Sequence, residues 1–202
     1  PIENSVITLN PFQSSHEVIL LSPSWNAYNS PFDEYLLLEL YTPTGLNKFD
    51  TDYQYATSSP RGVSGVGIRL WHVDARLIKY VSGNPVASPT YTNTVSGCKL
   101  MMSNTYYSSS TTGYISPLGR SYADYNILQL IRNSTTATYK PNDYLRDAYL
   151  FKNGSSFKMD TYKKQFVQSG KLNSGVALGW EFSVSISGSG ASSVAKVTVN
   201  KI

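Results

Sequence analysis

Short apolar runs separated by turn residues dominate the chain, and they predict β-strands. Runs rich in β-forming residues lie at 7–9, 17–21, 34–41, 67–74, 99–103, 125–131, 180–186 and 194–199. Helical signals are confined to 144–149, where Asn142-Asp143 could cap one or two turns. Many short strands and little helix predict an all-β fold, a jelly-roll-like β-sandwich with long loops.

The run at 67–74 alternates in a way that gives its residues two distinct faces. One face holds Ile68, Leu70, His72 and Asp74, and the other holds Arg69, Trp71 and Val73. Because apolar residues occur on both faces, we expect this strand to be covered on both sides, with Trp71 as a large buried anchor. His72 and Asp74 are expected to be linked by a hydrogen bond, direct or through a third group.

Neither repeats nor a clear linker divide the 202 residues, which predicts a single domain over 1–202. A small all-β tail from about residue 155 is the alternative. The flexible segment 187–193 is expected to join the last two strands as a hairpin-type connection.

Composition narrows the class of protein. The net charge of +4 comes from scattered basic residues, without the stripe or motif that nucleic-acid binding needs. The longest apolar runs fall far short of the about 20 residues that span a bilayer. Cys98 is the single cysteine, which excludes an internal disulfide and favours a bacterial exported protein over a eukaryotic secreted one.

Two segments of the sequence begin like known catalytic motifs, and each lacks a residue that its motif requires. The segment His16-Glu17-Val18-Ile19-Leu20 opens like the zinc-protease motif H-E-x-x-H but has Leu20 in place of the second histidine. The segment 62–66 resembles a nucleophile elbow but has Val66 where glycine belongs. No phosphate-binding loop or dinucleotide fingerprint is present, so the sequence predicts a chain that is not itself an enzyme and holds no organic cofactor.

Two weaker patterns suggest binding. Asn47, Asp50 and Asp52 offer oxygen ligands within a short segment, which suits calcium better than a transition metal. The segment 103–121 is expected to be a long exposed loop rich in tyrosine, and its Tyr106, Tyr107 and Tyr114 could stack on sugar rings.

The strongest signal lies in two neighbouring strands. The succession EYLLLELYTPTGLNKFD at 34–50, followed by GVGIRLWHVDARL at 65–77, resembles the region after the catalytic domain of immune-inhibitor-A-type secreted zinc metallopeptidases. The matching residues are Glu34, Tyr35, Leu37, Glu39, Gly45, Gly67, Leu70, Trp71, His72, Val73 and Asp74. Departures at Leu40-Tyr41 and Arg69 indicate a divergent branch. Flanking segments at 7–21, 150–157 and 178–199 look similar to the family more weakly.

The resemblance implies a non-catalytic accessory region of a secreted or cell-surface bacterial metallopeptidase. Zinc would belong only to an upstream catalytic domain, which this region would support or assist in substrate or surface binding. Glu39, Trp71, His72 and Asp74 would then be a structural signature, and an apolar docking patch is expected near the strand at 7–9. The alternative is an independent carbohydrate-binding or cell-surface adhesion module using the Tyr106 region.

Overall fold

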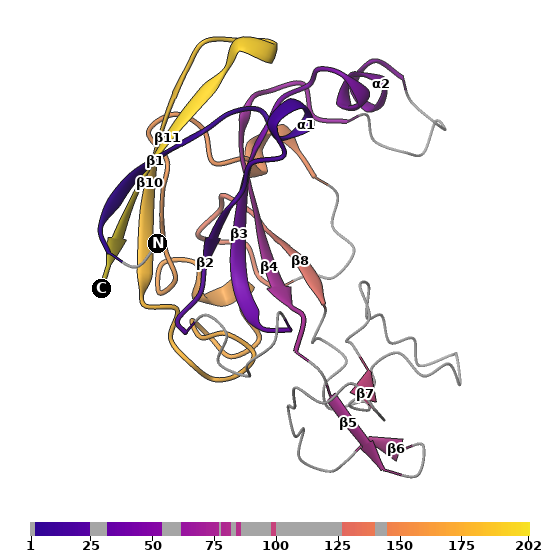
Figure 1. The fold of residues 1–202 in the computed structure, drawn as a ribbon, viewed down its shortest axis with the longest axis vertical. Helices are drawn as coiled ribbons and strands as arrows, with labels where there is room; N and C mark the ends of the chain where they lie inside the picture. The colour runs from indigo at the N-terminus through magenta and orange to yellow at the C-terminus, as the bar shows by residue number, and fades with distance from the viewer. Residues whose placement is uncertain are drawn as a thin grey trace.

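The computed structural model describes residues 3–24, 32–53, 62–76, 78–81, 84–85, 98–99, 127–139 and 145–202. Two four-stranded antiparallel sheets dominate this part of the chain (Figure 1). Sheet A has the order β1 (Ser5–Leu9), β11 (Val194–Lys201), β10 (Trp180–Ser187) and β9 (Ser156–Lys158). Sheet B has the order β2 (Ile19–Leu21), β3 (Glu34–Tyr41), β4 (Gly67–Asp74) and β8 (Leu128–Ile131).

The remaining elements are short. A small three-stranded sheet joins β6 (Asn84–Pro85), β5 (Ile78–Val81) and β7 (Cys98–Lys99), and lies below the two large sheets in Figure 1. The helices are α1 (Phe12–Ser15) and α2 (Leu46–Asp52), with 3-10 turns η2 (Asp147–Tyr149), η3 (Lys163–Gln165) and η4 (Gly190–Ser192).

One hydrophobic core fills the space between sheets A and B. It combines Leu36, Leu38 and Leu40 of β3 with Phe182 and Val184 of β10, all buried. The alternating sequence of β10 sends its apolar side chains inward and its serines outward. Rings from segments distant in sequence pack closely at the centre of this core, since Phe157 and Phe182 stack with centroids 5.2 Å apart. The mostly β fold class predicted from the sequence is therefore confirmed, with two sheets arranged as in a sandwich.

Most of the predicted strands match observed ones. The predictions at 34–41 and 67–74 coincide with β3 and β4, whereas β2 begins two residues later than predicted. In the described part of the predicted helical turn, residues 145–149, the structure has the 3-10 turn η2, and α1 and α2 lack a clear signal in the sequence. At the C-terminal end, β10 and β11 form the expected hairpin, while β1 pairs with β11 in register Ile7 to Val197. Residues after 155 thus share a sheet with the N-terminal strand.

Candidate functional site

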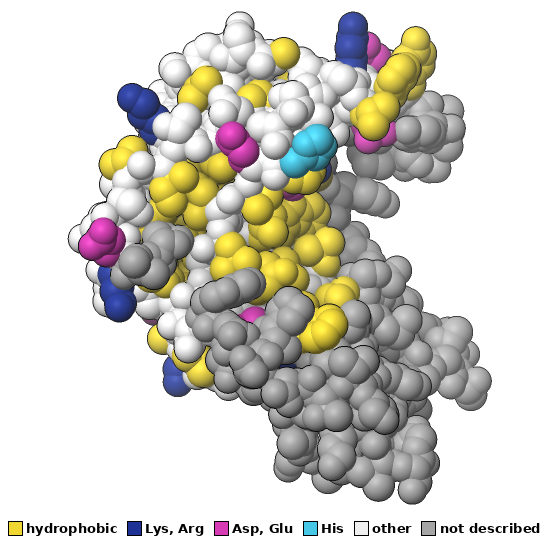
Figure 2. Space-filling model, viewed as in Figure 1, with side chains coloured by type: hydrophobic (Ala, Val, Ile, Leu, Met, Phe, Trp, Pro, Cys, Tyr) yellow, Lys and Arg dark blue, Asp and Glu magenta, His cyan; other side chains and the backbone are white. Residues whose placement is uncertain are grey.

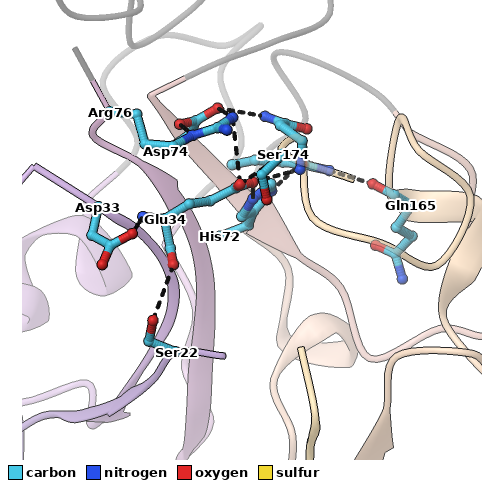
Figure 3. A network of polar contacts seen from close by, with 10 residues as sticks. Ser22, Asp33, Glu34, His72, Asp74, Arg76, Gln165 and Ser174 are labelled. Carbon is cyan, nitrogen blue, oxygen red and sulfur yellow. Dashed lines mark hydrogen bonds and ion pairs between the residues drawn. The ribbon is translucent and has the colours of Figure 1, made fainter. Parts of the chain in front are cut away.

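A group of buried charged side chains lies where β3 begins and β4 ends (Figure 3). The antiparallel register places Glu34 opposite Asp74 and Leu36 opposite His72. Residues at two-residue spacing share a face, so Glu34, His72 and Asp74 all point towards sheet A. Arg76 follows directly after β4, and it is 1% exposed.

Glu34 and His72 form the centre of this group. His72 Nε2 lies 2.7 Å from Glu34 Oε1, and the other ring nitrogen, Nδ1, lies 3.3 Å from Gln129 Oε1. The amide nitrogen of Gln129 donates to the backbone carbonyl of Gln165 at 2.6 Å, which leaves its oxygen facing the imidazole. Both ring nitrogens therefore face acceptors, the arrangement that a doubly protonated imidazole satisfies best.

A loop from the other half of the chain closes over the same carboxylate. The N–H groups of Asn173 and Ser174 donate to Glu34 Oε1 and Oε2 at 2.5 and 2.9 Å. The Asn173 side chain donates to Asp74 Oδ2 at 3.0 Å. One loop between η3 and β10 is thus held by acids from both β3 and β4.

Arg76 completes the network by contacting both of its carboxylates, those of Asp74 and Glu34. Its guanidinium makes a bidentate contact with Asp74, with Nε to Oδ1 at 2.7 Å and Nη2 to Oδ2 at 2.8 Å. Nη2 also lies 3.4 Å from Glu34 Oε2. His72 and Asp74 are therefore linked through Glu34 and Arg76, whereas the sequence predicted a direct bond or one intermediate group. We call Glu34, His72, Asp74, Arg76 and Asn173 the buried clamp.

Charges within the buried clamp compensate one another. Burial would raise the pKa of Glu34, but the hydrogen bond and charge of His72, with the charge of Arg76 and the Ser174 contact, lower it to about 2. Burial would likewise lower the pKa of His72, yet Glu34, Asp74 and Gln129 together raise it above its ordinary value. Two carboxylates, one guanidinium and one imidazolium make the group neutral, which is how a protein interior tolerates four ionised side chains.

The geometry of the buried clamp suits holding the fold together better than acting on a substrate. Four donor groups surround the Glu34 carboxylate, and both nitrogens of His72 are used within the protein. Glu34 and His72 are 2% and 1% exposed. A general base must reach a proton on its substrate, and neither group is presented for this.

The remaining two signature residues lie on the opposite face of sheet B. Glu39 Oε1 accepts from Arg69 Nε and from Trp71 Nε1, each at 2.6 Å. The Arg69 guanidinium lies 5.1 Å above the Tyr41 ring and 5.4 Å from the Trp71 ring. Trp71 is half-buried on this outer face, so the prediction of a fully buried anchor is wrong. Sheet A covers the inner face of its strand, and on the outer face Tyr41, Val63 and Leu150 form a small buried cluster beside Gly67, the first residue of β4.

The suggested calcium ligands lie on α2 and take part in other contacts. The Asn47 amide donates to the Thr42 carbonyl at 3.0 Å, and Asp52 lies 3.9 Å from Lys48. Helical geometry turns Asp50 and Asp52 about 200° apart, so the helix does not bring the three together. In the part of the chain that the structure describes, no group of three or more His, Cys, Asp or Glu side chains could hold a metal ion. Tyr106, Tyr107 and Tyr114 lie outside the described residues.

Sequence reasoning missed several members of the network. Arg76, Gln129, Gln165 and Asn173 received no role, and Glu34 was not predicted to be a partner of His72. A partial signal existed for Glu34, because it shares the inward face of β3 with Leu36 and Leu38, where a carboxylate needs buried partners. No local pattern identifies Asn173, which comes from a loop about 140 residues further along the chain.

Comparison of the chain with protein-family models, curated proteins and solved structures gives no match. Among the described helices, none is long and apolar enough to cross a membrane.

Proposed function

We propose that this chain is a non-catalytic accessory β-sandwich region of a secreted bacterial zinc metallopeptidase, acting in support of the catalytic domain. The observation that carries the proposal is the buried clamp. Glu34, His72 and Asp74 belong to the family resemblance, and all three are buried in charge-balanced contacts that tie sheet B to the loop at 173–174. These residues look like a catalytic set, and we propose that in this chain they hold the fold together.

The histidine content supports the same proposal. The chain contains two histidines, and His72 has both ring nitrogens committed within the clamp. The other, His16, is exposed at the end of α1 in a left-handed backbone conformation, with φ of 58°. A zinc peptidase needs several fixed ligands together with a general base. Under this proposal, we expect the zinc chemistry to belong to a catalytic domain elsewhere in the parent protein.

Hydrolysis assays test the proposal directly. We expect the 202-residue chain with added zinc to hydrolyse neither casein nor gelatin above a buffer control. The complete polypeptide encoded by its reading frame should hydrolyse them and lose this activity with a chelator. Chelator-sensitive hydrolysis by the chain alone, or none by the complete polypeptide, would contradict the proposal.

One observation favours the second candidate, a carbohydrate-binding or adhesion module. A cavity of about 420 Å³ opens at β9 and β10, and its lining combines hydroxyl and amide side chains, including Ser156, Thr161, Ser183 and Asn200, with aromatic and charged ones. Its volume is within the range of small-ligand sites, and hydroxyl-rich surfaces suit neutral sugars. A polysaccharide pull-down with the chain and with Asn200→Ala separates the candidates, because retention lost in the variant would favour glycan binding.

A further inference from the structure

The helix α2 turns its apolar side chains towards solvent. Leu46, Phe49 and Tyr53, the last at its C-terminal cap, are 82%, 59% and 66% exposed. At about 100° per residue these positions fall within an arc of about 60°, so they form one stripe along the helix. The rings of Phe49 and Tyr53 stack with centroids 6.5 Å apart. We call these three residues the exposed stripe, and Figure 2 shows hydrophobic side chains projecting from the corner where Figure 1 places α2.

The polar side of α2 faces the body of the protein. The Asn47 amide donates at 3.0 Å to the carbonyl of Thr42, a fully buried residue. The Thr51 hydroxyl lies 2.8 Å from the carbonyl of the buried Val63. A surface helix ordinarily packs its apolar stripe on the core and leaves its polar face in water. The hydrogen bonds of α2 hold it in the reverse orientation, so its apolar side chains are kept in contact with solvent.

We propose that the exposed stripe docks on the surface of a lipid bilayer of low net charge. Its three side chains would enter the boundary between the headgroups and the acyl chains. This contact goes beyond the proposed function and does not depend on the peptidase assignment.

The area of the exposed stripe favours a bilayer over a protein partner. With about 150–250 Å² for each aromatic side chain, the exposed fractions correspond to roughly 400 Å² for the whole stripe. A stable complex of two protein chains buries about 800 Å² per partner, and this holds for a second copy of the chain as well. An interfacial helix needs only its apolar face to enter the bilayer, to a depth of about 5–10 Å. A projecting stripe meets a flat bilayer without requiring a complementary groove.

The side-chain types of the exposed stripe suit the same boundary. Leu46 and Phe49 are apolar throughout, whereas Tyr53 has a hydroxyl at the end of its ring. Tyrosine is enriched at membrane–water interfaces because its ring is apolar and its tip is polar. The stripe therefore combines two residues that favour acyl chains with one that favours the headgroup level.

The charges of α2 favour zwitterionic headgroups. Lys48 and Asp52 form a loose ion pair at 3.9 Å, with side chains 67% and 48% exposed. One lysine and two aspartates, the second being Asp50, give the helix a net charge of −1. Anionic lipids attract clusters of lysine and arginine, which α2 does not offer. A phosphocholine headgroup carries a phosphate that complements Lys48 and a cation that complements Asp52.

Flotation with phosphatidylcholine vesicles tests the proposal on the 202-residue chain. We expect part of the chain to float with the vesicles at millimolar lipid. Replacing some of the phosphatidylcholine by phosphatidylglycerol should not increase the floated fraction. Absence of the chain from the floated fraction, or flotation only with phosphatidylglycerol, would overturn the proposal.

Variants test whether the exposed stripe makes the contact. Leu46→Ser combined with Phe49→Ser should reduce the floated fraction at least about fivefold, because two of the three entering side chains are then polar. Phe49→Trp should float at least as well as the parent, since tryptophan also favours the interface. Val6→Ser is the matched control, because Val6 is 64% exposed on β1, and it should float like the parent. An equal loss in Val6→Ser would show non-specific adsorption and overturn the proposal.

Two further measurements complete the test. The thermal midpoint of the double variant should equal that of the parent, because both positions are exposed, and this separates lost contact from lost folding. Sedimentation velocity without lipid should show a monomer, and self-association that Phe49→Ser abolishes would overturn the proposal, since the occupant would then be a second copy. A chain that floats through the exposed stripe, encoded in a polypeptide without peptidase activity, would support the bilayer contact and contradict the proposed function.

Discussion

The two faces of the β3-β4 pair carry similar polar groups that differ in how fully the basic partner is buried. On the inner face, Glu34 meets His72 and Arg76 at 1–2% exposure, beneath a loop from the far end of the chain. On the outer face, Glu39 is also buried, at 4% exposure, but its partner Arg69 is 22% exposed. Coulomb attraction is stronger where water is excluded, but an unpaired charge is also far more costly there. We therefore expect the inner group, in which every charged partner is buried, to contribute more to stability than the outer group, whose arginine reaches solvent.

Breaking the inner group should have the largest effect on stability. Glu34→Gln keeps the side-chain volume but leaves His72 and Arg76 with excess positive charge in the core. Removing one partner of a buried ion pair costs about 3–5 kcal/mol, so we expect the free energy of unfolding to fall by that amount. Denaturant unfolding followed by circular dichroism measures it.

The matched variant on the outer face is Arg69→Met. It removes one of the two donors to Glu39, whose carboxylate is buried but keeps the Trp71 Nε1 donor, so we expect a loss of about 1–3 kcal/mol in the same measurement. Equal losses for Glu34→Gln and Arg69→Met would show that burial does not distinguish the two faces.

The second prediction concerns Trp71, which the sequence placed in the core and the structure places on the outer face. Because the indole is half-buried, Trp71→Ala should cost about 2 kcal/mol, below the about 3–5 kcal/mol of a fully buried aromatic residue. Phe182→Ala supplies that reference, since Phe182 is 2% exposed between the sheets. A loss for Trp71→Ala as large as that for Phe182→Ala would mean that the indole is buried in solution.

Trp71 shows which structural features of the strand at 67–74 could be predicted from the sequence. Alternation in the strand at 67–74 predicted correctly which residues share a face, because the period of two is a property of the extended backbone. It did not predict which face would meet sheet A, since Trp71 and Val73 are as apolar as Ile68 and Leu70. That choice depends on pairing with β3 and on packing against segments far along the chain.

The buried clamp illustrates the same limit. His72 and Asp74 were singled out from their shared face, but their partners are brought in by tertiary structure. The β3-β4 register places Glu34 near His72 and Asp74. Asn173 comes from a loop that no local pattern connects to either strand. Single-sequence patterns report local geometry, so the members contributed by one strand could be predicted and the closing loop could not.

The last prediction is a pH dependence that reports the charge state of the clamp. The pKa of His72 is raised above 6.5, so the stability from its imidazolium is present below pH 6.5 and is lost as pH rises through the folded-state pKa. The pKa of Glu34 is lowered from 4.5 to about 2, so its contribution is present above pH 4.5 and is lost towards pH 2. Stability should therefore be greatest between these limits and should decline on the alkaline side by about 1.4 kcal/mol for each unit by which the His72 pKa is raised. The charged groups facing the imidazole are Glu34 and Asp74, with Arg76 beyond them, while Gln129 and the Phe166 ring are neutral.

Two variants separate His72 from every other titrating group in this measurement. His72→Gln should be less stable than the parent in mild acid and should lack the alkaline decline, because no group in the clamp then releases a proton near neutrality. His16→Gln changes the other histidine, which is exposed, and should retain the decline. Thermal or urea unfolding across pH 4 to 9 provides the curves. A decline that persists in His72→Gln would place the titration at another group. It would also mean that the imidazole of His72 in the parent protein is neutral.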